Sequence, residues 1–350
     1  MILILAALCA AGWLCALLKC RVERALPLLP ALGMLVMVPL AMARALWLTD
    51  VLSALLIAAT AVALVARRER LRELGKRLLT PGLLAFAMLA ALSYFATRGR
   101  VVWEWDEYSY WALKVKELWY FDGVLDSLHT LTPRFGDYLP GAQTLLWWTL
   151  RATGGWNEST LYFGMMLLNL TYLLPLTERL SWRRAGWLAL LIPVMIALPT
   201  ALSANIYVSL GVDTLLGMQM GYLLYLIWEQ RSERTKLHFV SALLTLCAMT
   251  LTKQVGLLWG AIALGFGAVI AQKGERKAAL RRTLLLALPA VGCLMGWKAF
   301  CGANGLQNYL SAYAGENLSQ MNSLSWFMPL GYKTFLLKTL KAFLFAPVSG

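Results

Sequence analysis

The chain has 350 residues, of which 60% are hydrophobic and only 14% are charged. This composition is far more apolar than that of a soluble domain, so it predicts an all-α protein that crosses a membrane many times. A net charge of +14 also occurs in nucleic-acid-binding proteins, but here the basic residues fall in short loops between apolar segments. We therefore expect no nucleic-acid partner.

The sequence lacks the motifs of several common functional classes. Its six cysteines show no CxxC or Cys–His spacing, which predicts small packing residues and no metal or redox site. His129 and His238 are far apart in the chain, so no histidine-based triad is expected. No P-loop is present, which excludes a transporter subunit with its own nucleotide site.

Eleven apolar runs predict about eleven membrane-spanning helices. The first run is expected to be a retained span, because it has no basic segment before it and no clear cleavage site after it. The first three spans, within residues 1–77, are expected to form an N-terminal membrane segment. Residues 78–350 would then form the main membrane core, with an external loop at 97–157. The runs are 1–18, 25–43, 51–66, 78–96, 158–177, 185–198, 212–228, 239–252, 254–271, 283–301 and 333–348.

Basic residues gather in five clusters between these runs. All five lie on one side of the membrane if each run crosses once, and the positive-inside rule makes that side the cytoplasm. Residues 97–140 then lie outside, followed by an interfacial helix at 141–152 that is too short and too rich in tryptophan to count as a span. External turns are expected at 199–211 and 252–254, and a further external loop at 302–332. We therefore expect a multi-pass protein of the cytoplasmic (inner) membrane whose active face is extracytoplasmic. The clusters are Lys19, Arg21 and Arg24; Arg67, Arg68, Arg70, Arg72, Lys76 and Arg77; Arg179, Arg183 and Arg184; Arg231, Arg234 and Lys236; and Lys273, Arg276, Lys277, Arg281 and Arg282.

The external loop opens with an unusual stretch, VVWEWDEYSYWALKVKELWYFDG, at residues 101–123. Residues 108–121 have helical spacing, which predicts an amphipathic helix lying at the membrane–water interface. One predicted face carries Trp111, Val115, Leu118 and Trp119, and the other carries Tyr110, Lys114 and Glu117.

Two adjacent carboxylates, Asp106 and Glu107, fall at the start of this helix. One acid there has a purely structural explanation, because a helix N-terminus favours negative charge. A pair suggests further roles: a general base toward an acceptor hydroxyl, or a ligand that holds a divalent cation against a phosphate. Lys114, Lys116 and Arg134 in the same loop suit an anionic group.

Three further positions stand out on the predicted outer side. The segment HTLTPRFGDYLPG, residues 129–141, has the prolines and glycines of a shaped turn and contains Asp137 and Tyr138. Asp213 opens a span, either as an acid of the site or as a helix-capping carboxylate. Lys253 lies in a tight turn, where it either neutralises a phosphate or reaches toward lipid headgroups. Weaker candidates for the same mouth are Asn205, Tyr207 and Gln254.

The segment WEWDEYSYWALKVK resembles the hallmark of the GT-C superfamily of membrane glycosyltransferases, an acidic pair in the first large external loop beside a juxtamembrane helix. The later DYLPG resembles the Tyr-Pro-Pro-type element that often follows in that loop. The resemblance covers roughly residues 78–270 in layout and only these short motifs in sequence. It implies a GT-C-like helical bundle and a polyprenyl-phosphate-linked sugar as donor.

The resemblance also implies roles for individual residues. Asp106 would be the general base, or less readily a metal ligand, with Glu107 assisting it. The donor phosphate would meet Lys114, Arg134 or Lys253. Trp105, Tyr108 and Trp111 would stack on sugar or pack on lipid. The acceptor would be a hydroxyl of a glycan, lipid or protein, and no cofactor beyond a possible divalent cation is implied. Two alternatives stay open: a transporter or flippase for a lipid-linked or anionic solute, and a polysaccharide polymerase or ligase.

Overall fold

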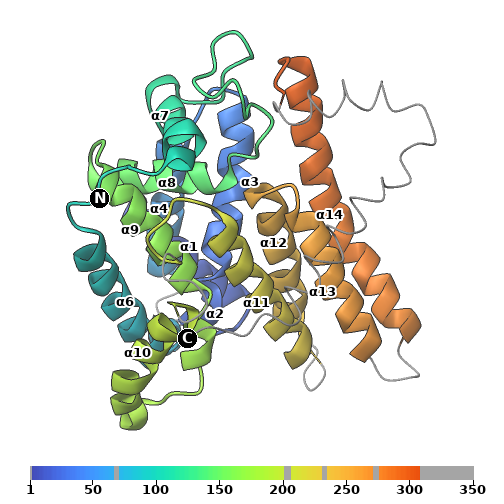
Figure 1. The fold of residues 1–350 in the computed structure, drawn as a ribbon. Helices are drawn as coiled ribbons and strands as arrows, with labels where there is room; N and C mark the ends of the chain where they lie inside the picture. The colour runs from blue at the N-terminus through green and yellow to red at the C-terminus, as the bar shows by residue number, and fades with distance from the viewer. Residues whose placement is uncertain (1, 67–70, 201–205, 231–234, 271–275, 308–350) are drawn as a thin grey trace, which may run out of the picture. The chain divides into compact units, whose positions relative to one another are not determined.

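The computed structural model describes residues 2–66, 71–200, 206–230, 235–270 and 276–307, and residues 1–306 form one compact unit. The described chain is all-helical, without a strand, which confirms the predicted all-α class (Figure 1). Ten of the eleven apolar runs contain a helix. The eleventh, at 333–348, and most of the predicted loop at 302–332 lie outside the described residues. The helices are α1 (Ile2–Leu17), α2 (Val22–Ala25), α3 (Leu28–Met42), α4 (Leu48–Ala66), α5 (Leu71–Leu78), α6 (Pro81–Thr97), η2 (Glu107–Trp111), α7 (Ala112–Phe121), α8 (Gly141–Thr153), α9 (Glu158–Thr171), η3 (Leu174–Thr177), η4 (Trp182–Trp187), α10 (Leu188–Thr200), α11 (Asp213–Glu229), α12 (Lys236–Thr252), α13 (Gly256–Ile270) and α14 (Arg276–Ala303).

Only a few of these helices are individually long and apolar enough to cross a membrane. Within the described chain they are Val22–Met42, Leu48–Ala66 and Arg281–Ala303. A fourth span would arise if Arg72–Leu78 and Pro81–Thr97, which meet at a 47° bend, act together. The sequence predicts about eleven spans. In the described part of the chain, the length and composition of the helices identify three, or four with the bent pair.

The shorter helices end early for local reasons. The run at 158–177 breaks where α9 stops at Thr171 and the 3₁₀ helix η3 follows, with a proline, Pro175, near its start. The run at 185–198 begins inside the 3₁₀ helix η4 instead of a regular helix. Because an α-helix rises about 1.5 Å per residue, helices of this length cover less than the roughly 30 Å hydrocarbon core.

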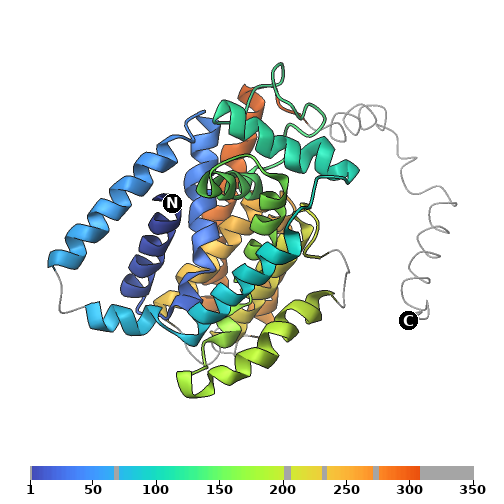
Figure 2. The same cartoon turned by 90° about the vertical axis from the view of Figure 1, so that its left-hand side faces the viewer.

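The centre of the unit is α12, which packs against α3, α11, α13 and α14. On α3, Leu28, Ala31 and Met34 are fully buried in the same hydrophobic core. By contrast, α4 lies beside α1 (Figure 2), where Trp13 donates a 2.9 Å hydrogen bond to Thr60. Most of the apolar surface of α4 is exposed. The helix α3 shares this core with later helices. The division of the chain at residue 77 stays a prediction.

One end of the bundle collects the segments predicted to be external, and we call it the Asp106 end. In both views α7 lies across this end, and α10 lies at the other (Figure 1, Figure 2). Hydrogen bonds join loops that are far apart in the sequence. They are Leu46 N to Asp122 O (3.1 Å), Val124 N to Ala41 O (2.9 Å), Leu210 N to Glu107 Oε1 (2.8 Å), Gln254 Nε2 to Asp137 O (3.0 Å) and Ser127 N to Asn304 O (3.1 Å).

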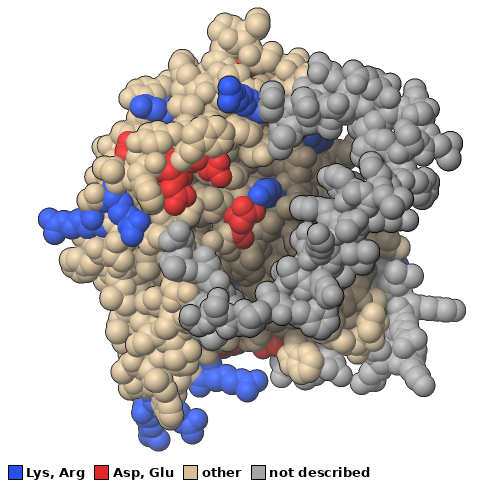
Figure 3. Space-filling model, viewed as in Figure 1, with Lys and Arg blue, Asp and Glu red and all other residues tan. Residues whose placement is uncertain are grey.

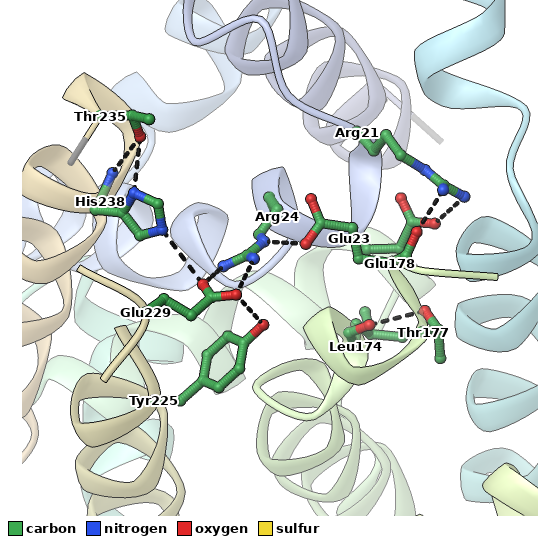
Figure 4. Close-up of polar contacts among 10 residues, drawn as sticks. All are labelled: Arg21, Glu23, Arg24, Leu174, Thr177, Glu178, Tyr225, Glu229, Thr235 and His238. Carbon is green, nitrogen blue, oxygen red and sulfur yellow. Dashed lines mark hydrogen bonds and ion pairs between the residues drawn. The ribbon is translucent and has the colours of Figure 1, made fainter. Parts of the chain in front are cut away.

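The opposite end, which we call the Arg24 end, collects segments predicted to be cytoplasmic. Arg24, almost fully buried, pairs with Glu178 at 2.6 Å and with both oxygens of Glu229 (Figure 4). Glu229 also accepts a hydrogen bond from Tyr225 at 2.7 Å and lies 3.3 Å from His238 Nε2. This network ties α2, α11, α12 and the segment after η3 together. The described segments that these contacts join therefore gather at the two ends that the predicted topology assigns to them, while the crossing of a membrane by each helix stays a prediction.

The helix α8 starts and finishes at the Asp106 end. A Cβ on Gly141, its first residue, would lie 2.4 Å from the carbonyl oxygen of Leu251 in the last turn of α12. In its last turn, Arg151 pairs at 2.7 Å with Asp50, at the start of α4. The helix therefore does not run the length of the bundle, in keeping with the predicted interfacial helix at 141–152. It differs from that prediction in being buried on nearly all sides, because it packs against α3, α7 and α9.

Candidate functional site

The acidic pair stands at a break in helical regularity. The chain becomes helical just before Asp106, widens into the π-helix η2 at Glu107–Trp111, and continues as α7. Single π-turns inside α-helices are rare and are frequently found at functional sites. Asp106 is exposed, and its carboxylate makes no hydrogen bond or ion pair with any residue that the structure describes. This carboxylate is therefore available to an incoming group.

Its neighbour Glu107 has a different environment, since its side chain is fully buried. Oε1 accepts the backbone N–H of Leu210 at 2.8 Å, and Oε2 accepts a short hydrogen bond from the hydroxyl of Tyr162 on α9. Hydrogen bonds from such donors stabilise a buried carboxylate. Glu107 therefore holds the start of η2 to two other segments, and only Asp106 of the pair faces outward.

An aromatic cluster forms the base of this region. Tyr110 donates a 3.1 Å hydrogen bond to the carbonyl of Tyr138, and its ring packs edge-on against Trp111 and Tyr138. Burial raises the pKa of Tyr110 well above its usual value, so its hydroxyl stays protonated. Phe135 packs against the rings of Tyr110 and Tyr138 and against the exposed ring of Trp105, at 6.4 Å between the centroids of Trp105 and Phe135. Trp105 and the exposed Tyr108 thus stand at the rim beside Asp106.

The polar face predicted for the interfacial helix is not exposed. Tyr110, Lys114 and Glu117 are all buried, because the segment after α7 folds back over them. Lys114 donates to Glu117 at 2.9 Å and to Thr130 at 3.3 Å. Burial lowers the pKa of Lys114, and the charge of Glu117 opposes that shift. In this geometry Lys114 is a structural partner of Glu117 and is not presented to an anionic ligand.

Glu117 organises the segment that covers it. Its Oε1 accepts the backbone N–H of Leu125 at 3.1 Å, and its Oε2 accepts Leu131 N–H at 2.8 Å and the Thr130 hydroxyl at 2.7 Å. Both oxygens are therefore saturated. The buried pair of Lys114 and Glu117 fixes the path of the chain toward Arg134, which is exposed.

Asp137 joins its own loop to the turn between α12 and α13 and to α14. Its carbonyl accepts hydrogen bonds from Gln254 at 3.0 Å and from the indole of Trp297 at 2.8 Å. Its Oδ2 accepts from Lys298 of α14 at 3.0 Å, while its Oδ1 is buried and has no hydrogen-bond partner among the described residues. Asp137 is nearly buried, whereas the Lys298 side chain is 43% exposed. The sequence-based prediction missed Lys298 because it lies inside an apolar run.

Asp213 and Lys253 are neighbours, as expected for two residues at one mouth. Lys253 Nζ lies 2.6 Å from Asp213 Oδ1, with side chains 33% and 73% exposed respectively. Such an exposed pair is worth little in stability and opens at low cost. Figure 3 shows acidic side chains gathered on the upper part of one face, with basic side chains beside them.

These contacts close into a ring of four segments, which we call the outer ring. Glu107 binds Leu210, and three residues further on Asp213 binds Lys253. Gln254, next in the chain, binds Asp137, whose neighbour Tyr138 accepts the hydrogen bond from Tyr110 of η2. The ring therefore returns to the helical turn that bears Asp106. It consists of η2 and the segments 206–213, 252–254 and 131–140.

Most predicted site residues thus lie on or beside the outer ring. The weaker candidate Tyr207 is buried and donates to the carbonyl of Met195, and Asn205 lies outside the described residues. Among the described residues, no group of three or more His, Cys, Asp or Glu side chains is placed to hold a metal ion. No family model, curated protein or solved structure matches this chain.

Proposed function

We propose that the chain is a polytopic membrane glycosyltransferase of the GT-C type, with about eleven spans and its active face on the extracytoplasmic side of the cytoplasmic membrane. It would transfer a sugar from a polyprenyl-phosphate donor to a hydroxyl of a glycan, lipid or protein acceptor. The observation that carries the proposal is the unpartnered Asp106 carboxylate at a π-turn, on a ring that also presents Lys253. The segregation of loops to two ends supports the membrane topology.

In this mechanism Asp106 is the general base. The acceptor hydroxyl gives its proton to the Asp106 carboxylate as its oxygen attacks the anomeric carbon of the sugar. The bond between that carbon and the phosphate oxygen breaks, and the electron pair leaves with polyprenyl phosphate. Negative charge grows on the phosphate, so a cation placed there lowers the barrier. Lys253, Arg134 and Lys298 are exposed or half-exposed cations near the outer ring.

The remaining residues have supporting roles. Glu107 positions the backbone that carries Asp106, since both of its oxygens are occupied. Asp137 and Tyr138 hold the ring closed, and Asp213 keeps Lys253 at its edge. Trp105 and Tyr108 offer exposed aromatic faces on which a sugar ring stacks. In the alternative role, the Asp106 carboxylate would be a ligand of a divalent cation that binds the donor phosphate.

A direct assay tests the activity itself. Proteoliposomes that contain the purified chain would be incubated with polyprenyl-phosphate-linked sugars and a mixture of hydroxyl acceptors. The proposal predicts release of polyprenyl phosphate that depends on both acceptor and protein. If no donor of this class is consumed by folded protein, the proposal is wrong.

A transporter or flippase is the second candidate, and one observation favours it. The helix α11 carries polar side chains at more than one level, buried at Gln219 and half-buried at Tyr225 and Glu229. Gln219 Nε2 donates to Thr252 at 3.2 Å and to Tyr172 at 3.3 Å, and Tyr225 donates to Glu229 at 2.7 Å near the Arg24 end. Polar groups inside a membrane often mark a solute path. Movement of a lipid-linked sugar between leaflets without chemical change, lost on Gln219→Leu, would favour this candidate over the transferase.

A further inference from the structure

The Arg24 end contains a hollow that the outer ring does not use. It has a volume of about 570 Å³ and is lined by Arg183, Arg184, Gly186, Trp187, Ala189 and Leu190. This volume is within the range of small-molecule sites. The hollow lies where η4 runs into α10, on the opposite end of the bundle from Asp106.

The local backbone explains how charge and aromatic surface meet there. In a 3₁₀ helix, side chains three residues apart lie one above the other. Arg184 and Trp187 are therefore aligned along one edge of η4. The helix then continues as α10, on which Leu190 and Val194 leave much of their surface exposed. The hollow thus has a cationic rim that leads onto an apolar helix surface.

The two arginines of the hollow differ from the structural arginines nearby. Arg24 is buried and paired with Glu178 and Glu229. Arg183 and Arg184 are exposed, and neither guanidinium has an ion-pair partner in the part of the chain that the structure describes. No described residue therefore neutralises their charge, which is available to an anion.

We infer that this hollow binds an anionic phospholipid from the cytoplasmic leaflet. The phosphate would lie between the guanidinium groups of Arg183 and Arg184, which suit bidentate contacts to phosphate oxygens. An acyl chain would follow Leu190 and Val194, and Trp187 would lie at the level of the headgroup, where tryptophan is enriched in membrane proteins. Basic pockets beside cytoplasmic ends of membrane helices bind lipid headgroups in this way.

Lipid binding in detergent tests the inference. The purified chain would be titrated with phosphatidylglycerol or with phosphatidylcholine of the same acyl chains, and adducts counted by native mass spectrometry. Phosphatidylglycerol is expected to bind in preference. The double variant Arg183→Ala/Arg184→Ala should lower its affinity about 30-fold, which corresponds to about 1 kcal/mol of attraction to the anionic headgroup for each arginine. Arg183→Lys/Arg184→Lys, which keeps the charge without the planar fork, should fall between the two.

Arg72→Ala/Lys76→Ala is the matched control, because it removes two exposed positive charges from α5 outside the hollow. It should bind phosphatidylglycerol nearly as the unaltered chain does. Equal losses in both double variants, or no loss in either, would overturn the site. Full displacement of the lipid by inorganic phosphate would show that the acyl chain does not bind along α10, and would overturn the assignment of a phospholipid to this hollow. The inference rests on the proposed membrane location, and the assay contains no sugar donor, so it fails or succeeds independently of the transferase activity.

Discussion

Glu107 accepts a hydrogen bond from the hydroxyl of Tyr162, a contact between residues 55 positions apart in the chain. It joins the π-helix beside the candidate base to α9. Tyr162→Phe removes the donor and leaves a buried charge with one fewer partner, which costs about 1.5–3 kcal/mol for a hydrogen bond to a charged group. We expect the midpoint of thermal unfolding in detergent to fall accordingly.

The control for that substitution is Tyr108→Phe, which removes an exposed hydroxyl from the same π-helix. Its unfolding midpoint should stay close to that of the unaltered chain. Equal midpoints for Tyr162→Phe and Tyr108→Phe would show that Glu107 does not depend on its contact with α9.

The buried pair of Lys114 and Glu117 predicts strong coupling between two substitutions. Lys114→Met leaves the Glu117 carboxylate buried without its cation, and loss of one partner of a buried pair costs about 3–5 kcal/mol in free energy of unfolding. Adding Glu117→Gln removes the unpaired charge, so the double variant should be less destabilised than the sum of the single ones, by about 0.5–3 kcal/mol. A double-mutant cycle by chemical denaturation measures this. Strict additivity would contradict the pairing.

Close packing in the turn that carries Lys253 predicts a difference between two glycines of α13. A Cβ on Gly256 would lie 2.0 Å from the carbonyl oxygen of Met249, whereas a Cβ on Gly265 would meet nothing within 4 Å. Gly256→Ala should therefore destabilise the fold, because a backbone atom must move. Gly265→Ala should be neutral or should stabilise by up to about 1 kcal/mol through helix propensity. Similar melting curves for both variants would contradict the tight α12–α13 turn.

Part of this architecture could be predicted from the sequence. Ten of the eleven apolar runs located helices in the part of the chain that the structure describes. The side of a membrane on which each loop lies stays a prediction. The π-turn had no signal in the sequence, and nothing in an adjacent Asp-Glu pair indicates which acid is buried, because this depends on Tyr162 and Leu210. Helical spacing predicts a water-facing side for Lys114, because such spacing does not show that a later segment covers that face.

Replacement of Lys253 should weaken binding of the donor without destabilising the fold. Its partner Asp213 is largely exposed, so Lys253→Ala should change the free energy of unfolding by less than about 1 kcal/mol. In the transfer assay it should raise the KM for the polyprenyl-phosphate donor more than it lowers kcat, since it removes a cation from the phosphate. Arg98→Ala, a charge loss at an exposed position beyond the end of α6, is the control. An unchanged KM for Lys253→Ala would remove this residue from the site.

The account depends most on Asp106 as the general base. The decisive measurement is the rate of sugar transfer in proteoliposomes by Asp106→Asn, compared with Glu104→Gln, which neutralises a neighbouring acid that the mechanism does not use. Both variants should fold and insert normally, because Asp106 is exposed and the half-buried Glu104 side chain makes no ion pair with a described residue. The account predicts that Asp106→Asn loses about 100-fold or more of the transfer rate, the range attributed to general-base catalysis, while Glu104→Gln transfers sugar at nearly the unaltered rate. Full transfer activity by correctly folded Asp106→Asn would contradict it.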